Sequence, residues 1–269
     1  MPMKVVLITG GSSGIGKSIG LYLRSKGFTV YGTTRDLSNY PDFNHFSLVQ
    51  LEVTDKESVN SAVQGIIDKE GSIDVLVNNA GVGITGPIEE TPHEEIQKAF
   101  DINFNGPLHM AKAVLPHMRR QQSGCIINIT SIAGSMGLPY RGIYSATKAA
   151  MEIVTEALRM ETKDFGIRIT ALAPGDFATN IAAGRYHAPV REESPYKTPY
   201  AKTLKTINDD VDTADDPILV AKKVHEIITT AKPKVHYRVG DFMQKFSILL
   251  KKSLPSKVYE KLVLKHYKL

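Results

Sequence analysis

The chain has 269 residues, of which 42% are hydrophobic and 23% charged, fractions that exclude a disordered chain, a collagen or a coiled coil. Its apolar runs are only a handful of residues long, whereas a membrane-spanning helix needs about 20, and no signal-peptide cleavage site is evident. The single cysteine, Cys125, excludes an intramolecular disulfide and favours a reducing compartment, so we expect a cytoplasmic protein.

The net charge of +5 is concentrated at one end of the sequence. Residues 245–269 contain seven lysines and one acid, Glu260, and therefore carry +6, which leaves −1 for the rest of the chain. A nucleic-acid-binding protein would carry its basic surface on the folded module, interleaved with aromatic residues. Nucleic acid is therefore not an expected partner.

Short β-rich runs alternate with longer helical patterns along the chain. The expected strands are residues 4–9, 28–33, 46–53, 74–78, 125–130, 167–173 and 235–239. Helices are expected at residues 15–26, 92–118, 142–165 and 215–231, and another helix after residue 54. Near-continuous apolar strands separated by helices predict an α/β fold, a doubly wound parallel sheet of seven strands with helices on both faces.

Two helix starts carry the pattern of a capping box. Thr54 is followed three residues later by Glu57, and Thr91 by Glu94, so each threonine is expected to cap its helix. Pro107 falls inside the expected helix 92–118, where it should bend the helix or remove a backbone hydrogen bond.

The predicted catalytic domain spans residues 1–241, and two segments do not follow its alternation of strands and helices. Residues 182–213 are polar and contain three prolines, which favours a substrate lid. Residues 242–269 predict a basic tail of two amphipathic helices split at Leu254-Pro255. We expect the tail to dock on the domain or across a subunit contact, and the alternative is an interfacial helix that binds anionic lipid.

A glycine-rich turn follows the first strand, with the sequence Thr9-Gly10-Gly11-Ser12-Ser13-Gly14-Ile15-Gly16. Glycines allow the backbone to approach a pyrophosphate closely, and the start of the following helix offers free N–H groups and a positive dipole. In the first βα unit of an α/β chain, this turn predicts a Rossmann-type dinucleotide site formed by these residues, Gly11 excepted.

The end of the second strand predicts which dinucleotide binds. Thr34 stands where an NAD-selective chain would place an acid, and Arg35 follows it. Because a guanidinium group suits a 2′-phosphate, we expect NADP(H) rather than NAD(H). The alternative is a solvated Arg35 that pairs with Asp36.

Tyr144 and Lys148 lie four residues apart at the start of a helix and therefore share one face. The ammonium group of Lys148 would favour the ionised phenolate of Tyr144, which suits proton exchange near neutral pH. The pair alone is common, and by itself it would be better explained by helix packing or by a lysine that extends its charge to solvent.

Several motifs together resemble the short-chain dehydrogenase/reductase superfamily, over residues 4 to about 180: the glycine-rich turn, Asn78-Asn79-Ala80-Gly81, Asn103, Ser131, Tyr144-x-x-x-Lys148 and Pro174-Gly175-x-x-x-Thr179. Two further runs look most like the 17β-hydroxysteroid and retinol dehydrogenase branch: Gly83-Ile84-Thr85-Gly86-Pro87 and Met136-Gly137-Leu138-Pro139-Tyr140.

The resemblance implies a role for each of four catalytic residues. Tyr144 would be the general acid when a ketone is reduced, and Lys148 would favour its ionised form and bond the nicotinamide ribose. Ser131 would hydrogen-bond the substrate oxygen, as a donor aimed at developing negative charge. Asn103 would hold a water that links Lys148 to solvent. Without the other motifs, Ser131 and Asn103 would be taken as locally bonded polar residues.

The resemblance also implies cofactor contacts. Pro174, Gly175 and Thr179 would seat the nicotinamide carboxamide, and Asn78, Ala80 and Gly81 would line the cofactor site. The family usually has Asp before Val after the third strand, where it touches the adenine amino group. This chain has Glu52-Val53 there, and the longer side chain is expected to reach the same group.

The substrate pocket is expected between residues 83–87, residues 135–141 and the lid. Met136, Leu138 and Tyr140 favour an apolar or aromatic carbonyl compound. Arg141 could meet an anionic substrate, although a solvated arginine is favoured. The eight histidines show no zinc pattern, and no metal is expected.

The predicted function is an NADP(H)-dependent oxidoreductase that moves hydride between nicotinamide and a secondary alcohol or ketone of steroid-, retinoid- or other lipophilic type. A 3-oxoacyl-carrier-protein reductase is the alternative enzyme, and a nucleotide-sensing regulatory protein on the same fold is an alternative of another class. The resemblance further implies a homodimer or homotetramer that assembles through residues 92–118 and 142–165. Peripheral membrane contact through the tail is not favoured.

Overall fold

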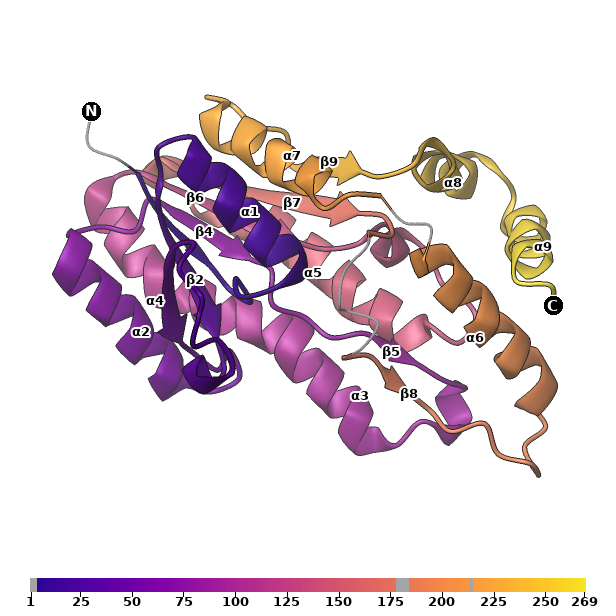
Figure 1. Cartoon of the computed structure of the whole chain (residues 1–269). Helices are drawn as coiled ribbons and strands as arrows, with labels where there is room; N and C mark the ends of the chain where they lie inside the picture. The colour runs from indigo at the N-terminus through magenta and orange to yellow at the C-terminus, as the bar shows by residue number, and fades with distance from the viewer. Residues whose placement is uncertain (1–3, 178–183, 213–214) are drawn as a thin grey trace.

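A seven-stranded parallel sheet forms the centre of the computed structural model, which describes residues 4–177, 184–212 and 215–269 (Figure 1). Its strand order is β3-β2-β1-β4-β6-β7-β9, and every neighbouring pair is parallel. The strands are β1 (Val5–Ile8), β2 (Thr29–Thr34), β3 (Ser47–Gln50), β4 (Val75–Asn78), β6 (Gly124–Ile129), β7 (Ile167–Pro174) and β9 (His236–Val239). The predicted doubly wound sheet is thereby confirmed.

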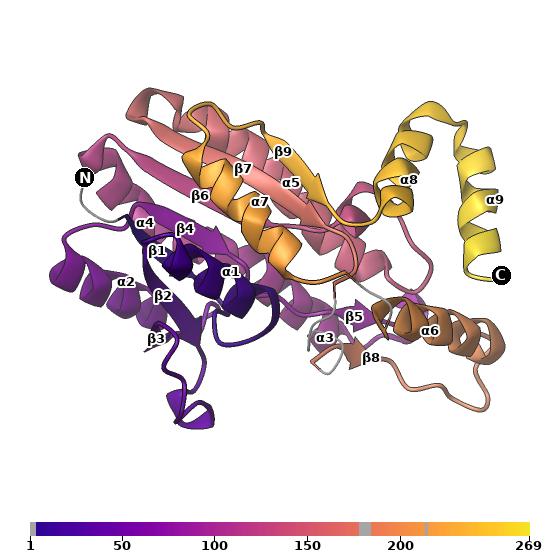
Figure 2. The same cartoon turned by 45° about the horizontal axis from the view of Figure 1, so that its top comes forward.

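Helices cover both faces of this sheet, because alternate residues of each strand point to opposite sides. In β1, Val6 and Ile8 pack under α1 (Gly14–Ser25) and α7 (Ile218–Thr229), which lie side by side in Figure 2. Val5 and Leu7 pack on the other face, in the core that is covered by α2 (Lys56–Glu70), α4 (Gly106–Gln121) and α5 (Gly142–Glu161).

The direction in which successive strands are added to the sheet reverses between β1 and β4. At such a switch point the connections leave in opposite directions, so the carboxyl ends of the strands open into a crevice where ligands bind. The glycine-rich turn follows β1, Asn79 follows β4, and Ser131 comes shortly after β6. The sheet therefore gathers the motifs along one edge.

The helix predicted over residues 92–118 consists of two helices joined by a π-helical turn. These are α3 (His93–Phe100), the π turn Asp101–Asn105, and α4. Pro107 has no N–H to donate to the carbonyl of residue 103, so the α-helical hydrogen-bond pattern cannot pass through this point. The break in helical hydrogen bonding expected at Pro107 is therefore found in the residues before it, Asp101–Asn105.

Both predicted capping boxes are wrong in detail. The side chain of Asp55, not that of Thr54, caps α2 by accepting hydrogen bonds from the backbone N–H groups of Glu57 and Ser58. Thr91 donates its hydroxyl to the carbonyl of Pro87 at 2.7 Å and does not cap α3. Thr54 and Asp55 are both good capping residues, so the sequence alone does not decide which of them caps α2. At α3, the Thr91 hydroxyl is instead used in a hydrogen bond within the preceding turn.

Part of the predicted lid is folded against the domain. A two-stranded parallel ladder joins β5 (Ile84–Thr85) to β8 (Tyr186–His187), and α6 (Lys197–Asp212) follows. Tyr200 on α6 is buried and donates its hydroxyl to the carbonyl of Ala188 at 3.0 Å. Residues 182, 183 and 213 of the predicted lid lie outside the described residues.

The predicted tail consists of α8 (Phe242–Ser253) and α9 (Ser256–His266), which lie against the domain by one face. Ile248 and Tyr259 are buried beside Ile132 and Met136, and the Tyr259 hydroxyl approaches the Met136 sulfur at 2.8 Å. The outer face leaves apolar side chains exposed, Phe242 and Leu249 among others. Among the described residues, no helix combines the length and apolarity needed to cross a membrane.

We expect Ile248→Ala to lower the free energy of unfolding by about 2–5 kcal/mol, because the substitution leaves a cavity where the tail meets the domain. Denaturant titration followed by circular dichroism measures this loss. Leu249→Ala is the matched control, because its side chain is 56% exposed, and a change within about 0.5 kcal/mol is expected. Equal losses for the two variants would contradict the docked position of α8.

Candidate functional site

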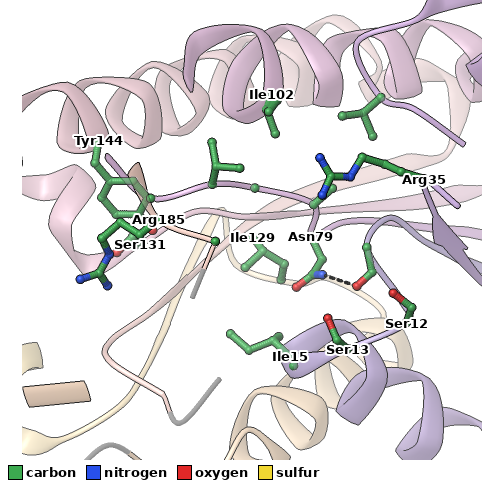
Figure 3. Close-up of a pocket in the computed structure, with 18 of the residues that line it drawn as sticks. Ser12, Ser13, Ile15, Arg35, Asn79, Ile102, Ile129, Ser131, Tyr144 and Arg185 are labelled. Atoms are coloured by element: carbon green, nitrogen blue, oxygen red, sulfur yellow. Dashed lines mark hydrogen bonds between the residues drawn. The ribbon is translucent and has the colours of Figure 1, made fainter. Parts of the chain in front are cut away.

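A cavity of about 490 Å³ runs along the carboxyl edge of the sheet. Ser12, Ser13 and Arg35 lie at one end, and Ser131, Tyr144 and Arg185 lie at the other, as Figure 3 shows. The cavity therefore connects the glycine-rich turn to the predicted catalytic residues.

The glycine-rich turn forms the first end of the cavity. Gly10 and Gly14 have φ angles of +64° and +52°, in the left-handed region that glycine tolerates best. A Cβ atom on Gly16 would collide with the carbonyl oxygen of Gly10, so the turn can close only with glycine there. Ser13 precedes α1 without capping it by its side chain. Because Ser13, Gly14 and Ile15 line the cavity, the N-terminus of α1 borders it and suits a phosphate group.

Asn79 fastens the turn to the loop after β4. Its side-chain amide donates to the carbonyl of Thr9 at 2.9 Å and to that of Gly10 at 3.2 Å. The Thr9 hydroxyl in turn accepts from the backbone N–H groups of Asn79 and Ala80. Thr9 thus supports the cavity wall from behind. Asn79, which the sequence analysis left out of the cofactor site, lines the cavity together with Ala80 and Gly81.

Two other predicted cofactor residues also lie behind the wall. Asn78 is buried, and its amide donates to Asn128 at 2.8 Å and to the carbonyl of Pro107 at 3.4 Å. Gly16 packs against Gly10 inside the turn. Neither is among the described residues that line the cavity, so both act on the shape of the site.

Arg35 reaches the cavity from the end of β2 with an exposed side chain. Asp36 does not hold it: the Asp36 carboxylate accepts instead from the Ser38 backbone and hydroxyl, and these hydrogen bonds lower its pKa. Within the described part of the chain, the Arg35 guanidinium makes no ion pair or hydrogen bond. It is therefore free to receive an anionic group.

Glu52 and Val53 line the same end of the cavity. The Glu52 carboxylate accepts from the Thr54 backbone at 3.1 Å and from the Thr54 hydroxyl at 3.0 Å. The predicted adenine contact by Glu52 would therefore have to use its remaining acceptor capacity.

Tyr144 and Lys148 lie on the first turns of α5, where both line the cavity. The Lys148 nitrogen is 5.8 Å from the centroid of the Tyr144 ring and donates to the carbonyl of Ile129 at 3.2 Å. Lys148 is buried, whereas the hydroxyl of Tyr144 makes no hydrogen bond within the described residues. The phenol is thus available to a ligand, with a cation beside it.

Ser131 lies between β6 and the 3₁₀ turn Ile132–Ser135, at the same end of the cavity as Tyr144. Its oxygen accepts a hydrogen bond from the backbone N–H of Ala133 at 3.2 Å, which orients the side chain. The hydroxyl proton remains available to a ligand oxygen in the cavity.

Asn103 lies in the π-helical turn and is buried. Its side chain exchanges two hydrogen bonds with the backbone of Val82, at 2.8 and 2.9 Å, and donates to the Thr147 hydroxyl at 3.2 Å. These bonds join the turn, the loop after β4 and the helix that carries Tyr144. The side chain of Asn103 therefore positions the site, and the water expected at this residue stays a prediction.

Pro174 and Gly175 line the cavity at the end of β7, and Asp176 follows them. Gln244 on α8 holds this loop: its amide donates to the Asp176 carboxylate at 2.9 Å, and its oxygen accepts from the Asp176 backbone at 3.3 Å. The contact with the tail was not foreseen from the sequence. The predicted cofactor residue Thr179 lies outside the described residues.

Of the five residues predicted to form the substrate pocket, Ser131 and Tyr144 line the cavity, and the other three are placed elsewhere. Met136 and Leu138 pack against the tail helices, and Tyr140 contacts the ring of Tyr200 at 5.2 Å. None of them is among the described residues that line the cavity. Two cationic residues, Arg141 and Arg185, line the cavity together with Gly83, Ile84 and Thr85 of the predicted segment 83–87. Arg141 therefore faces the cavity, whereas a solvated arginine was expected there.

No three His, Cys, Asp or Glu side chains converge on a possible metal position within the described ranges. Cys125 is buried in β6, and burial raises the pKa of its thiol to about 11. It therefore stays protonated at neutral pH and is a poor nucleophile.

Comparison with known proteins bears on this site. The sequence model described as short chain dehydrogenase matches residues 4–189. The chain is 36% identical to the 3-ketodihydrosphingosine reductase of Bacteroides thetaiotaomicron, over 97% of this chain and 96% of that protein. It is 30% identical to an uncharacterised oxidoreductase of Bacillus subtilis, over 98% and 99% of the two chains.

Solved structures agree with this result. A short-chain dehydrogenase from Streptomyces avermitilis has a TM-score of 0.82 and 31% identity, with 100% of this chain and 97% of that chain covered. ElxO with NADP bound has a TM-score of 0.72 and 30% identity, with 88% and 97% covered. These matches confirm the resemblance seen in the sequence motifs. The protein is a member of the short-chain dehydrogenase family of oxidoreductases.

Proposed function

We propose that this protein is an NADP(H)-dependent oxidoreductase of ketones and secondary alcohols, with Tyr144 as the proton donor and acceptor. One observation carries the proposal: the hydroxyls of Tyr144 and Ser131 line the same cavity, the former without a hydrogen-bond partner among the described residues. The intact set of Tyr144, Lys148 and Ser131 favours catalysis over a nucleotide-sensing role, which would need only the glycine-rich turn.

The residues present fit a dinucleotide. The N-terminus of α1 and the N–H groups of the glycine-rich turn would hold the pyrophosphate, and Arg35 would receive a 2′-phosphate. Pro174 and Gly175 would border the nicotinamide. The NADP bound by ElxO, a structural neighbour at 30% identity, supports NADP(H) as the cofactor of this chain.

The residues around Tyr144 then perform the proton chemistry. When bound, NADPH supplies the hydride that reduces the carbonyl carbon. Tyr144 gives its phenolic proton to the carbonyl oxygen, and the ammonium group of Lys148 stabilises the phenolate that remains. Ser131 donates a hydrogen bond to the same oxygen as negative charge develops there. In the oxidative direction, Tyr144 takes the proton back.

A lipophilic ketone is the substrate class predicted from the sequence. The relative named 3-ketodihydrosphingosine reductase supports that class, since the compound in its name is a long-chain ketone. Met136 and Leu138 do not contribute to this preference, because they pack against the tail, but Val82, Ile84 and Phe177 give the cavity an apolar lining. A 3-oxoacyl-carrier-protein reductase remains the alternative, to be separated by substrate assay.

Assembly is proposed to proceed through α4 and α5. Ile153 and Met160 on α5 are each 67% exposed, and a subunit contact over this helix would bury both side chains. Homodimers or homotetramers would then form in solution, and analytical ultracentrifugation measures the state directly.

The test is a panel of ketones and alcohols with NADPH and NADP⁺, followed by absorbance of the reduced nicotinamide. It includes 3-ketodihydrosphingosine, a 3-oxoacyl-carrier protein and short aliphatic ketones. We expect steady turnover of at least one ketone with NADPH, and loss of that turnover in Tyr144→Phe. Tight NADPH binding without turnover of any member would instead support the nucleotide-sensing role.

A further inference from the structure

Two guanidinium groups border the substrate end of the cavity. The Arg141 guanidinium carbon lies 5.6 Å from the centroid of the Tyr144 ring. Arg185, which begins the segment leading into β8, extends beside Tyr144 and Ser131 in Figure 3. Gly83 makes room for it, because a Cβ atom there would lie 2.8 Å from the Arg185 side chain.

The negative charge of Asp176 favours the charged form of both arginines, so the positive charge of this pair is offset only in part. Lys148 adds a third cation, and Asp176 is the acidic residue that lines this end of the cavity. The Asp176 carboxylate accepts the Gln244 amide, and within the described residues it forms no ion pair with either arginine. The region next to Tyr144 is therefore positively charged.

Arg185 has a buried group without a partner. Its Nη1 atom is buried and makes no hydrogen bond within the described part of the chain. Burial, and then the positive charge of Arg141, lower the pKa of Arg185 from its ordinary value. An arginine nevertheless keeps its charge at neutral pH, so the orphaned donor is costly unless a ligand satisfies it.

The guanidinium charge of Arg141 is stabilised by more neighbouring groups than that of Arg185. Burial disfavours its charge, but Tyr267, Asp176 and Tyr144 outweigh burial and raise its pKa. Tyr267, which follows α9, also makes a side-chain hydrogen bond with it. Arg141 is thus held in place as a fixed cation, beside the Arg185 donor that lacks a partner.

We propose that Arg185, assisted by Arg141, binds an anionic oxygen group of the substrate, so that the preferred substrates are ketones bearing a carboxylate or a phosphate. A guanidinium fork matches both groups in geometry and charge. The inference rests on the proposed function, since it names the substrate class of the same site. It differs from the lipophilic class named above, because a neutral ketone leaves Arg185 unpaired and an amino ketone adds positive charge.

The cofactor's own phosphates are not the natural partner of this pair. They belong at the N-terminus of α1 and at Arg35, and Figure 3 places Ser12, Ser13 and Arg35 at the opposite end of the cavity from Arg185. A contact between Arg185 and the cofactor would nevertheless show as weaker NADPH binding, which the experiment below measures separately.

The experiment compares a homologous series of oxo-carboxylic acids with their methyl esters, under NADPH, with a keto phosphate and the amino ketone 3-ketodihydrosphingosine as further arms. For the wild-type protein, we expect kcat/KM for the best acid or phosphate to exceed that of its uncharged partner at least about 10-fold, as a charged hydrogen bond implies. The two anionic arms separate carboxylate from phosphate recognition.

Arg185→Met should erase most of this preference by raising KM for the anionic ketone, whereas Arg185→Lys should restore part of it. Arg191→Met is the matched control, because Arg191 is exposed and lies outside the cavity lining in the same segment. Equal turnover of acids and esters by the wild-type protein, or an equal loss on both in Arg185→Met, would overturn the proposal. So would an Arg185→Met protein whose main defect is NADPH affinity, measured by nicotinamide fluorescence.

Failure of the proposed function would look different. In that case neither acids nor esters would be reduced, or their reduction would survive Tyr144→Phe. Preference for the ester or the amino ketone, together with loss of turnover in Tyr144→Phe, would keep the enzyme and reject the anionic subsite.

Discussion

Tyr144→Phe is expected to lower kcat for ketone reduction by about 10²–10⁴-fold, the range that a positioned general acid contributes. The substitution removes the hydroxyl and keeps the ring, whose centroid lies 5.8 Å from the Lys148 nitrogen and 5.6 Å from the Arg141 guanidinium carbon. Packing and cofactor affinity should therefore stay close to those of the wild-type protein. Steady-state kinetics with NADPH measure the first effect, and fluorescence titration of NADPH measures the second.

The matched control for this change is Tyr140→Phe. Tyr140 precedes the same helix and contacts Tyr200, but it is not among the described residues that line the cavity. We expect its kcat to stay within a few-fold of wild type. A Tyr144→Phe protein that turns over as fast as Tyr140→Phe would rule out the phenol as the proton donor.

Arg35→Ala should produce the second large effect, a loss of cofactor discrimination. A charged hydrogen bond to phosphate is worth about 1.5–3 kcal/mol, so kcat/KM for NADPH should fall roughly 10- to 150-fold. The value for NADH should change little, because NADH has no 2′-phosphate for Arg35 to bind. Initial rates with both cofactors give the ratio.

Arg120→Ala serves as the control for Arg35, because Arg120 is exposed on α4 and bonds His117 away from the cavity. It should leave the NADPH to NADH ratio unchanged. A wild-type protein that prefers NADH, or an Arg35→Ala protein with an unaltered ratio, would show that Arg35 does not read the phosphate.

The sheet was predictable because its signal is local. The central strands β1, β4 and β6 are short, buried and mostly apolar runs, and β1 leads directly into the glycine-rich turn. The same holds for Tyr144 and Lys148, whose spacing places both on one face of α5. In these places the sequence pattern and the fold depend on the same few neighbouring residues.

The substrate end was not predictable, because it depends on contacts between distant segments. Met136 and Leu138 were expected to face a substrate, but α8 and α9 cover them instead. An apolar residue in a loop does not reveal which apolar partner will bury it. Arg185 gave no local signal at all, since its importance comes from the cavity it enters.

The final helices support two cavity residues during biosynthesis only after the whole chain has been made. Gln244 bonds Asp176, and Tyr267 bonds Arg141. The glycine-rich turn leaves the ribosome early, but the loop after β7 and the arginine before α5 gain these supports only when the final helices emerge. A nascent chain stalled before α8 should therefore have most of its sheet, while the loop after β7 lacks the hydrogen bonds from Gln244. Swapping the last 28 residues between relatives would likewise exchange the groups that support Asp176 and Arg141.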